Sequence, residues 1–290
     1  MSNPPLETIR PHVKDLGGFE VRRALPSRSR KTIGPFIFWD HMGPAQFAPG
    51  DGVAVRPHPH IGLATVTYLF DGEIMHRDSV GSVQRISPGD VNWMIAGRGI
   101  VHSERTPDES RAAGSRLHGI QTWLALPRAE EETAPAFAHH PKRTLPEIGR
   151  RGARGRVIAG HAFGERAPVQ VFSGTLYVAI ELDAGAQIVV PDEHPERAIY
   201  VVEGDLRAGG SSLPPLQVSV LPQRGEVRLE AASATRLMLF GGDPVDGERF
   251  IWWNFVSSSK ERIDQASRDW RDGRFDPVPG ETEFIPLPPR

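Results

Sequence analysis

Two short segments of the chain carry histidine and glutamate at alternating positions. The first contains His58 and His60, separated by one proline, and the second ends in His102 and Glu104. Side chains two residues apart in a β-strand project from the same face. If both segments are strands of one small barrel, all four groups point to a common interior site.

Three neutral imidazoles and one carboxylate form a donor set for a divalent transition metal. Such a set suits iron, manganese, nickel, copper or zinc, and it suits calcium or magnesium poorly. One carboxylate against a divalent ion leaves a net positive charge, which attracts an anionic substrate oxygen. A six-coordinate ion also retains open positions. These properties are expected of a catalytic metal site rather than of a closed structural one.

A competing interpretation is that the His-x-His pair is an ordinary polar pair on the surface. The flanking glycines, the shared spacing of the two segments and their strand-like surroundings favour a metal site. Pro57 and Pro59 fix the backbone on both sides of His58 and disfavour a central strand. We therefore expect this segment at a barrel rim or a strand entrance. His139 and His140, which precede a proline, are expected in a surface loop.

The elements that must position these residues are short strands. Apolar runs of strand length recur along the chain, rich in β-branched and aromatic residues and bounded by Gly, Pro or Asp-Gly. Together with 30 glycines and 27 prolines, this pattern favours a β-sandwich or barrel over a parallel α/β sheet. The runs lie at Phe36–Trp39, Ala64–Phe70, Val91–Ala96, Ile120–Leu126, Leu176–Leu182, Ile199–Val202 and Arg236–Phe240.

The two halves of the chain repeat a short pattern. Tyr68–Gly72 and Tyr200–Gly204 both follow Tyr-x-x-acid-Gly, and each comes after a segment with Pro and His. We interpret this repeat as a duplicated β domain with its seam within residues 130–156. Both acid-Gly pairs are predicted to be hairpin turns.

One helix is predicted near the end of the chain. Ser258–Glu261 fits a capping box, and apolar residues follow at helical spacing on one face. Gly273 is expected to end the helix. The proline-rich stretch Pro277–Pro288 is expected to pack as an extended strap.

Composition excludes several classes of function. The chain has no cysteine, so disulfides, thiolate metal sites and cysteine nucleophiles are excluded. Its formal net charge of −2 gives no general attraction for nucleic acid or anionic membranes. No stretch contains the roughly 18 apolar residues of a membrane span, and the N-terminus has no signal-peptide core. We expect a cytoplasmic protein that binds neither nucleic acid directly nor a membrane.

The first histidine segment resembles the cupin superfamily, and within it the pirin family. The first cupin motif is commonly written G-x5-H-x-H-x3–4-E-x6-G. Gly52, His58, His60 and Gly72 occupy its places, whereas Thr65 stands where glutamate is usual.

The second segment departs from the cupin pattern in the way that pirins do. Gly99 and His102 match the second cupin motif, and Gly97 replaces its proline. In pirins the carboxylate ligand comes two residues after the last histidine, which is Glu104 here. Three further segments look like pirin segments, namely Phe36–Pro44, Gly119–Pro127 and Trp252–Phe275.

The resemblance implies an all-β fold of two cupin barrels (double-stranded β-helices or jelly rolls) packed together, with a short C-terminal helix. We expect the metal site in a first barrel of residues 1–135. A second, metal-free barrel, with the helix and the strap, is expected in residues 136–290. Transferring the first-barrel spacing without gaps gives the second-barrel counterparts of the ligands as Val190, Asp192, Ala234 and Arg236. The neighbouring His194 and Glu196 leave a second metal site open.

The resemblance also implies a reaction. The metal ligands would be His58, His60, His102 and Glu104, with Fe(2+) as the expected ion. The expected activity is cleavage of a flavonol such as quercetin by dioxygen, a quercetin 2,3-dioxygenase reaction. Because Glu104 is the only carboxylate in this set, it is the expected catalytic proton acceptor.

Two other functions remain as alternatives. Family resemblance also allows a non-catalytic, metal- or redox-responsive regulator that binds a transcription factor or a metabolic enzyme. A cupin with another metal could instead catalyse isomerisation or hydrolysis. Trp93, Trp123 and Phe70 are candidates for lining a substrate pocket, but aromatic residues in β-barrels are more often core residues. Substrate-binding residues are therefore left unassigned.

Overall fold

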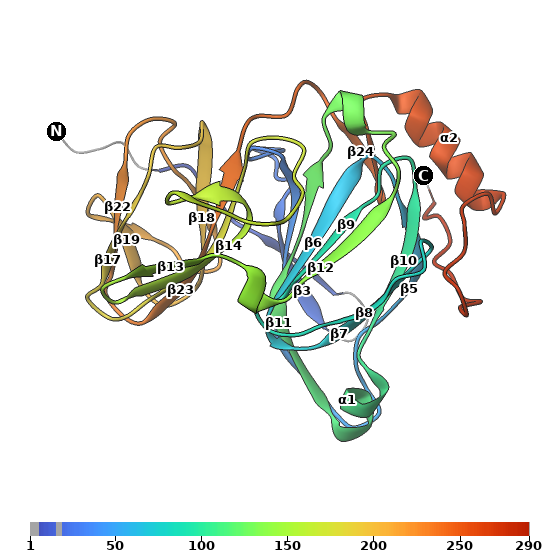
Figure 1. The fold of residues 1–290 in the computed structure, drawn as a ribbon, viewed down its shortest axis with the longest axis horizontal. Helices are drawn as coiled ribbons and strands as arrows, with labels where there is room; N and C mark the ends of the chain where they lie inside the picture. Colours follow the sequence, from blue (N-terminus) through green and yellow to red (C-terminus); the bar gives the residue numbers. More distant parts are fainter. Residues whose placement is uncertain (1–5, 16–18, 290) are drawn as a thin grey trace. The chain divides into compact units, whose positions relative to one another are not determined.

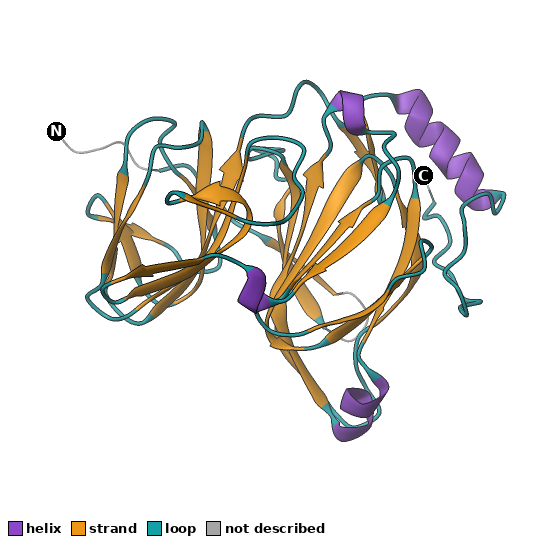
Figure 2. Ribbon diagram, in the orientation of Figure 1, coloured by secondary structure: helices purple, strands orange, loops and turns teal. Residues whose placement is uncertain are grey.

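The computed structural model describes residues 6–15 and 19–289. Nearly all regular structure in these residues is β (Figure 2). The one long helix is α2 (Lys260–Arg271), and the other helical segments are α1 (Asp108–Ala113), η1 (Arg128–Glu130) and η2 (Lys142–Thr144). The expectation of an all-β fold with a short C-terminal helix is confirmed. No helix in the described part of the chain is both long enough and apolar enough to span a membrane.

The chain divides into two compact units that are not continuous in sequence. Unit 1 comprises residues 1–13, 22–39 and 143–245, and unit 2 comprises residues 14–21, 40–142 and 246–290. This division differs from the expected boundary between residues 135 and 136. Strand β12 (Ala136–His140) pairs with β9 (Val91–Ile95), so it belongs to the sheet of unit 2. The C-terminal helix and tail also belong to unit 2.

Unit 2 contains a large sheet and a smaller one (Figure 1). Strands β2, β3 and β4 of the large sheet contribute residues to both units. The large sheet has the order β12-β9-β6-β11-β4-β3-β2, with β2 His12–Asp15, β3 Glu20–Leu25, β4 Phe36–Phe47, β6 Leu63–Gly72 and β11 Ser115–Ala125. The smaller sheet has the order β5-β10-β7-β8, with β5 Ala54–His60, β7 Ile74–Asp78, β8 Val83–Ile86 and β10 Ile100–Arg105. A further hairpin joins β24 (Phe250–Trp252) and β25 (Phe255–Ser257).

Unit 1 repeats this arrangement. Its large sheet has the order β1-β21-β18-β23-β16-β14-β13, with β15 beside β14; the bounds are β1 Thr8–Ile9, β13 Glu147–Arg150, β14 Ala153–Ala162, β15 Glu165–Arg166, β16 Thr175–Leu182, β18 Glu196–Glu203, β21 Val218–Val220 and β23 Thr235–Gly242. Its smaller sheet has the order β17-β22-β19-β20, with β17 Gln187–Val190, β19 Leu206–Ala208, β20 Ser211–Leu213 and β22 Val227–Ala231. By position, β17 and β22 are the counterparts of β5 and β10.

The two repeated Tyr-x-x-acid-Gly patterns occupy equivalent corners, not hairpins. Strand β6 pairs with β9 and β11, whereas the following β7 pairs with β8 and β10. The chain therefore changes sheets at Gly72, and it does the same at Gly204 between β18 and β19. Both glycines have positive φ, and a Cβ would collide with the carbonyl oxygen of Arg116 or of Ala234. Glycine is required at these corners by backbone geometry.

Each unit has its own apolar core. In unit 1, Trp39 stacks on Phe240 with ring centroids 4.1 Å apart, and Phe36 contacts the edge of Tyr177. In unit 2, a buried cluster is formed by Val21, Met42, Phe47, Val53, Leu69, Ile74, Ile86 and Leu117. Each unit thus buries enough apolar surface to fix its sheets.

Helix α2 begins one residue later than the predicted capping box. The N-cap is Ser259, whose hydroxyl accepts a hydrogen bond from the Arg262 amide at 3.2 Å. Ser258 instead donates its amide and hydroxyl to the buried carboxylate of Glu131. Ser258 is therefore engaged by Glu131, and Ser259 caps the helix in its place. The sequence alone does not show this tertiary contact.

A buried arginine holds together two loops of unit 1, the one after β17 and the one between β21 and β22. The guanidinium of Arg197 donates to the carbonyl oxygens of Pro191, Pro222 and Gly225 at 2.6, 2.7 and 2.9 Å, and its side chain is fully buried. Replacing it by methionine leaves these carbonyls without donors. We expect Arg197→Met to lower the free energy of unfolding by about 3–5 kcal/mol, measured by urea denaturation.

The matched control for this substitution is Arg236→Met. Arg236 is 28% exposed and pairs with Glu181 and Glu203 on the surface of the same unit. It should cost less than about 1 kcal/mol. Equal stabilities of the two variants would contradict the anchoring role of Arg197.

Candidate metal centre

Strand pairing brings the two predicted histidine segments together. His58 on β5 lies directly opposite His102 on β10, and His60 lies opposite Ile100. Strand β5 is at the edge of its sheet, which explains how Pro57 and Pro59 are accommodated without breaking a ladder on both sides. His58 and His60 lie among the last three residues of this edge strand.

Three histidines converge at this point. One ligand nitrogen from each of His58, His60 and His102 lies within 4.8 Å of the others, and all three side chains are buried. The Nε2 atoms of His60 and His102 are 3.1 Å apart. The Nδ1–H of His58 donates to the Arg56 carbonyl at 2.9 Å, which leaves its Nε2 free as a ligand.

Burial keeps these imidazoles neutral. It lowers the pKa of His60 and His102 well below the usual histidine value, and repulsion from the neighbouring His58 acts in the same direction. Burial also lowers the pKa of His58, although its bond to Arg56 and the nearby Glu104 carboxylate oppose the shift. Neutral imidazole is the form that binds a metal.

The donor set fits a transition metal. Two nitrogens that bind one ion at about 2.1 Å and at right angles are about 3.0 Å apart, close to the observed separation of the His60 and His102 nitrogens. In the absence of an ion, three buried imidazoles facing one another have few hydrogen-bond partners. The residues present can therefore hold a divalent ion.

Glu104 lies beside this cluster but is not one of the three mutually close ligands. It is buried, and its Oε1 accepts a hydrogen bond from the Gln121 side-chain amide at 2.7 Å. A bulge between His102 and Glu104 shifts the register of β10 against β5, so that Glu104 lies opposite Val55.

Sequence reasoning missed Gln121, His76 and Asp78. His76 and Asp78 follow the same alternation on β7 that selected the other pairs, and both are buried beside the cluster. The signal was present as His-x-Asp, but nothing in the sequence shows that β7 is the neighbour of β10. Gln121 has no local signal at all.

Of the three aromatic candidates, only Trp123 faces the histidines. Its ring contacts His60 edge-on, with centroids 5.2 Å apart. Trp93 is paired with Val66, on the sheet face opposite to Thr65 and Trp123. Phe70 contacts His118, away from the cluster.

Other histidines lie elsewhere in unit 2. His41 and His118 face each other, with their Nε2 atoms 2.8 Å apart. His139 and His140 lie in strand β12 rather than in the expected surface loop. Their strand is held by pairing with β9, where His139 lies opposite Asn92 and binds its side chain.

The counterpart positions in unit 1 are apolar. On β17 and β22, Ile188 lies opposite Leu229 and Val190 opposite Val227. The gapless transfer was wrong for both pairs, because Asp192 lies beyond the end of β17, Arg236 lies in β23 and Ala234 lies just before it. Connections in unit 1 are shorter, so a constant offset overshoots β22.

The C-terminal tail lies against the outer side of the two ligand-bearing strands. Ser103, which points away from the cluster, donates to Glu281, and Arg105 binds the same carboxylate at 2.7 Å. The Ile285 amide donates to the Pro57 carbonyl at 2.8 Å. The predicted extended strap is thus bonded to both β5 and β10.

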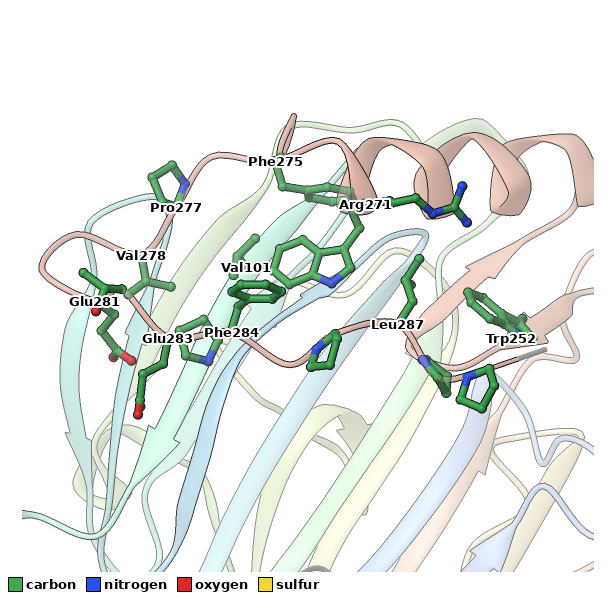
Figure 3. Close-up of a pocket in the computed structure, with 17 residues that line it drawn as sticks. Val101, Trp252, Arg271, Phe275, Pro277, Val278, Glu281, Glu283, Phe284 and Leu287 are labelled. Carbon is green, nitrogen blue, oxygen red and sulfur yellow. The ribbon is translucent and has the colours of Figure 1, made fainter.

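A cavity of about 810 Å³ lies between this strap, helix α2 and the barrel wall. Figure 3 shows Trp252, Phe275 and Phe284 around it, with Val101 at its inner wall. Because Val101 precedes His102 on the strand, the cavity is on the opposite face of the sheet from the histidines.

Small β-barrels that hold converging histidines define the cupin class of metal-binding proteins, and this chain contains two cupin domains. The chain belongs to the pirin family. Residues 18–124 match the Pirin family model, and residues 177–276 match the model of the pirin C-terminal cupin domain.

Similar proteins cover nearly the whole chain. A pirin-like protein of Caulobacter vibrioides is 50% identical over 279 residues, covering 95% of this chain and 96% of that protein. Mouse pirin is 32% identical, covering 89% and 88%. The crystal structure of a quercetin 2,3-dioxygenase from Acinetobacter baumannii matches with a TM-score of 0.92 at 32% identity, covering 100% of this chain and 97% of that one.

The buried histidines predict an acid-sensitive metal-free protein. Their pKa is lowered in the folded state, so the unfolded chain binds more protons below about pH 6.5, the ordinary histidine value. Stability is therefore lost as pH falls through 6.5. Each histidine contributes a slope of up to about 1.4 kcal/mol per pH unit. Urea denaturation of the metal-free protein between pH 7.5 and 5 measures this dependence of the free energy of unfolding on pH.

His60→Gln provides the comparison for this prediction. The substitution removes one of the three buried histidines of the cluster. The free energy of unfolding of the variant should therefore fall less steeply with decreasing pH, by the contribution of about one proton. Identical slopes for the variant and the wild type would contradict the burial of a neutral His60.

Proposed function

We propose that this chain is a metal-dependent flavonol dioxygenase of the quercetin 2,3-dioxygenase type. His58, His60, His102 and Glu104 would hold the ion, with iron as the proposed metal. The observation that carries the proposal is the convergence of three buried, neutral imidazoles inside one barrel. The similarity to a quercetin 2,3-dioxygenase of known structure supports the choice of reaction.

The protein groups define how a substrate would be handled. Three neutral imidazoles and one carboxylate leave a net positive charge around a divalent ion, which favours a deprotonated flavonol oxygen. Gln121 donates to Glu104 Oε1, and the carboxylate of Glu104 would act as the proton acceptor. The substrate 3-hydroxyl proton is transferred to this carboxylate.

The surroundings restrict water and limit competing reactions. Trp123 and Met94 are almost fully buried on the histidine face of the large sheet. A bound redox-active metal supplies the electron exchange with dioxygen that an organic side chain cannot provide. The overall reaction consumes one dioxygen and releases one carbon monoxide for each flavonol cleaved.

The metal site is tested directly by removing one ligand. We expect His60→Ala to reduce the affinity for ferrous iron by at least about 100-fold, because the remaining donors cannot complete the site. Anaerobic titration and elemental analysis measure this. His139→Ala, in the same unit but outside the cluster, should bind iron as the wild type does. Stoichiometric iron in His60→Ala would refute the site.

The reaction is tested with quercetin and protein of known iron content. We expect Glu104→Gln to retain the fold and, when compared at equal iron content, to lose about 10²- to 10⁴-fold in turnover, since a proton acceptor is removed. Oxygen uptake and carbon monoxide release are the measurements. Glu147→Gln, at an exposed ion pair in unit 1, is the control. Normal carbon monoxide release by Glu104→Gln would rule out this role.

A second function is favoured by the strap. Ser103 and Arg105 alternate with His102 and Glu104 on β10 and bind Glu281 on the outer surface. A change at the metal would thus be transmitted to an external segment, as a redox-responsive regulator requires. Iron-loaded wild type that consumes no oxygen with quercetin, but binds a partner protein differently in its ferrous and ferric forms, would favour this function.

A further inference from the structure

Behind the three histidines lies a second set of buried polar groups, on the neighbouring strand β7. His76 is 4% exposed and Asp78 is fully buried. In the β7–β10 ladder, Asp78 lies opposite His102 and His76 lies opposite Glu104. Two buried ionisable residues are costly to keep in a core unless they make specific bonds.

These groups form a continuous hydrogen-bonded chain to a proposed ligand. His102 Nδ1 is 3.3 Å from His76 Nδ1, and His76 Nε2 is 2.9 Å from Asp78 Oδ2. The other carboxylate oxygen, Oδ1, accepts the backbone amides of Val80 and Ser82 at 3.0 and 2.9 Å. This series of hydrogen bonds therefore ends at the Asp78 carboxylate, which accepts from His76 and from two backbone amides.

The direction of each bond follows from the chemistry of its ends. Burial would raise the pKa of Asp78, but the bonds from His76 and Ser82 outweigh it and lower the pKa below its ordinary value. An ionised carboxylate only accepts, so His76 Nε2 carries the hydrogen. In the form of the His76 ring that carries a single N–H, Nδ1 then accepts from His102 Nδ1–H. His102 Nε2 is left with its lone pair, facing the Nε2 of His60.

Packing holds this arrangement in place. The His76 ring stacks on Phe137, with centroids 4.3 Å apart and planes at 16°. Phe137 lies on β12, on the face that it shares with Met94. The ring is therefore fixed in its plane, and its two nitrogens cannot exchange roles without breaking either the Asp78 or the His102 bond.

We propose that Asp78 and His76 are positioning residues that fix the tautomer and ring orientation of His102 so that Nε2 is presented to the metal. This inference rests on the proposed metal site. A carboxylate at the far end of the chain also makes His102 a stronger electron donor, which favours the higher oxidation state of a bound ion. Removing the Asp78–His76 hydrogen bonds should weaken both the affinity for the metal and the preference for its higher oxidation state.

The first test uses metal-free protein and needs no activity. Long-range ¹H–¹⁵N spectra at pH 8 report which ring nitrogen of His102 is protonated. We expect Nδ1–H in the wild type and a mixture of both tautomers in His76→Leu, which has no acceptor. His76→Asn restores an acceptor oxygen near the position of Nδ1 and should restore the wild-type tautomer.

The control for loss of a buried histidine is His194→Asn. His194 is also 4% exposed and bonds a backbone carbonyl, but it lies in unit 1. This variant should leave the His102 spectrum unchanged. If His76→Leu also leaves the His102 tautomer unchanged, or if the wild type carries Nε2–H, the positioning role is overturned.

The second test uses protein reconstituted with ferrous iron. We expect His76→Leu to lose about 10- to 100-fold in iron affinity and His76→Asn to lose less. Asp78→Asn removes the charge, and we expect a tenfold smaller preference for ferric over ferrous iron, a rise of about 59 mV in reduction potential. Unchanged affinity and potential in all three variants would overturn the electronic part of the proposal.

The two tests separate this inference from the proposed function. A wild type that shows His102 Nδ1–H in the metal-free state but binds no iron refutes the metal site and supports the tautomer assignment. A wild type that binds iron normally with an unrestrained His102 refutes the positioning role alone.

Discussion

The metal centre depends on one cross-strand pair, His58 of β5 opposite His102 of β10. This pair aligns two neighbouring strands of a small sheet so that three buried imidazoles meet. Burial makes protonation unfavourable, and the neutral rings are then available as ligands. The other features near the site, the Gln121 bond to Glu104 and the Asp78–His76 chain, act on groups that this pair has already placed. Without the register of β5 on β10, these hydrogen bonds would have no assembled metal centre to orient.

The two units show how little of this function is a property of the fold. Both have the same sheet order and the same corner glycine, which backbone geometry requires at Gly72 and Gly204. At the paired positions of the smaller sheets, however, unit 2 has histidine and unit 1 has residues such as Ile188 and Leu229. A duplicated scaffold can thus retain its architecture through backbone constraints while only one copy retains ligands.

Local pattern was sufficient for much of the fold and for the histidine cluster. Alternation placed His58 with His60, and the strand runs and C-terminal helix were found from apolar periodicity. Long-range pairing was not available from the sequence. It decides that Asp71-Gly72 is a corner and not a hairpin, and that β12 belongs to unit 2. It also decides that His76 and Asp78 lie behind His102. These features depend on which strands are neighbours, a property of the whole chain.

The discontinuity of unit 2 has a consequence for biosynthesis. Its barrel strands lie mostly in residues 40–142, but the strap that bonds β5 and β10 comes from residues 246–290. A ribosome must synthesise all of residues 143–245 before that strap exists. The nascent protein therefore passes through a stage in which the ligand strands have been synthesised and the strap that bonds them has not.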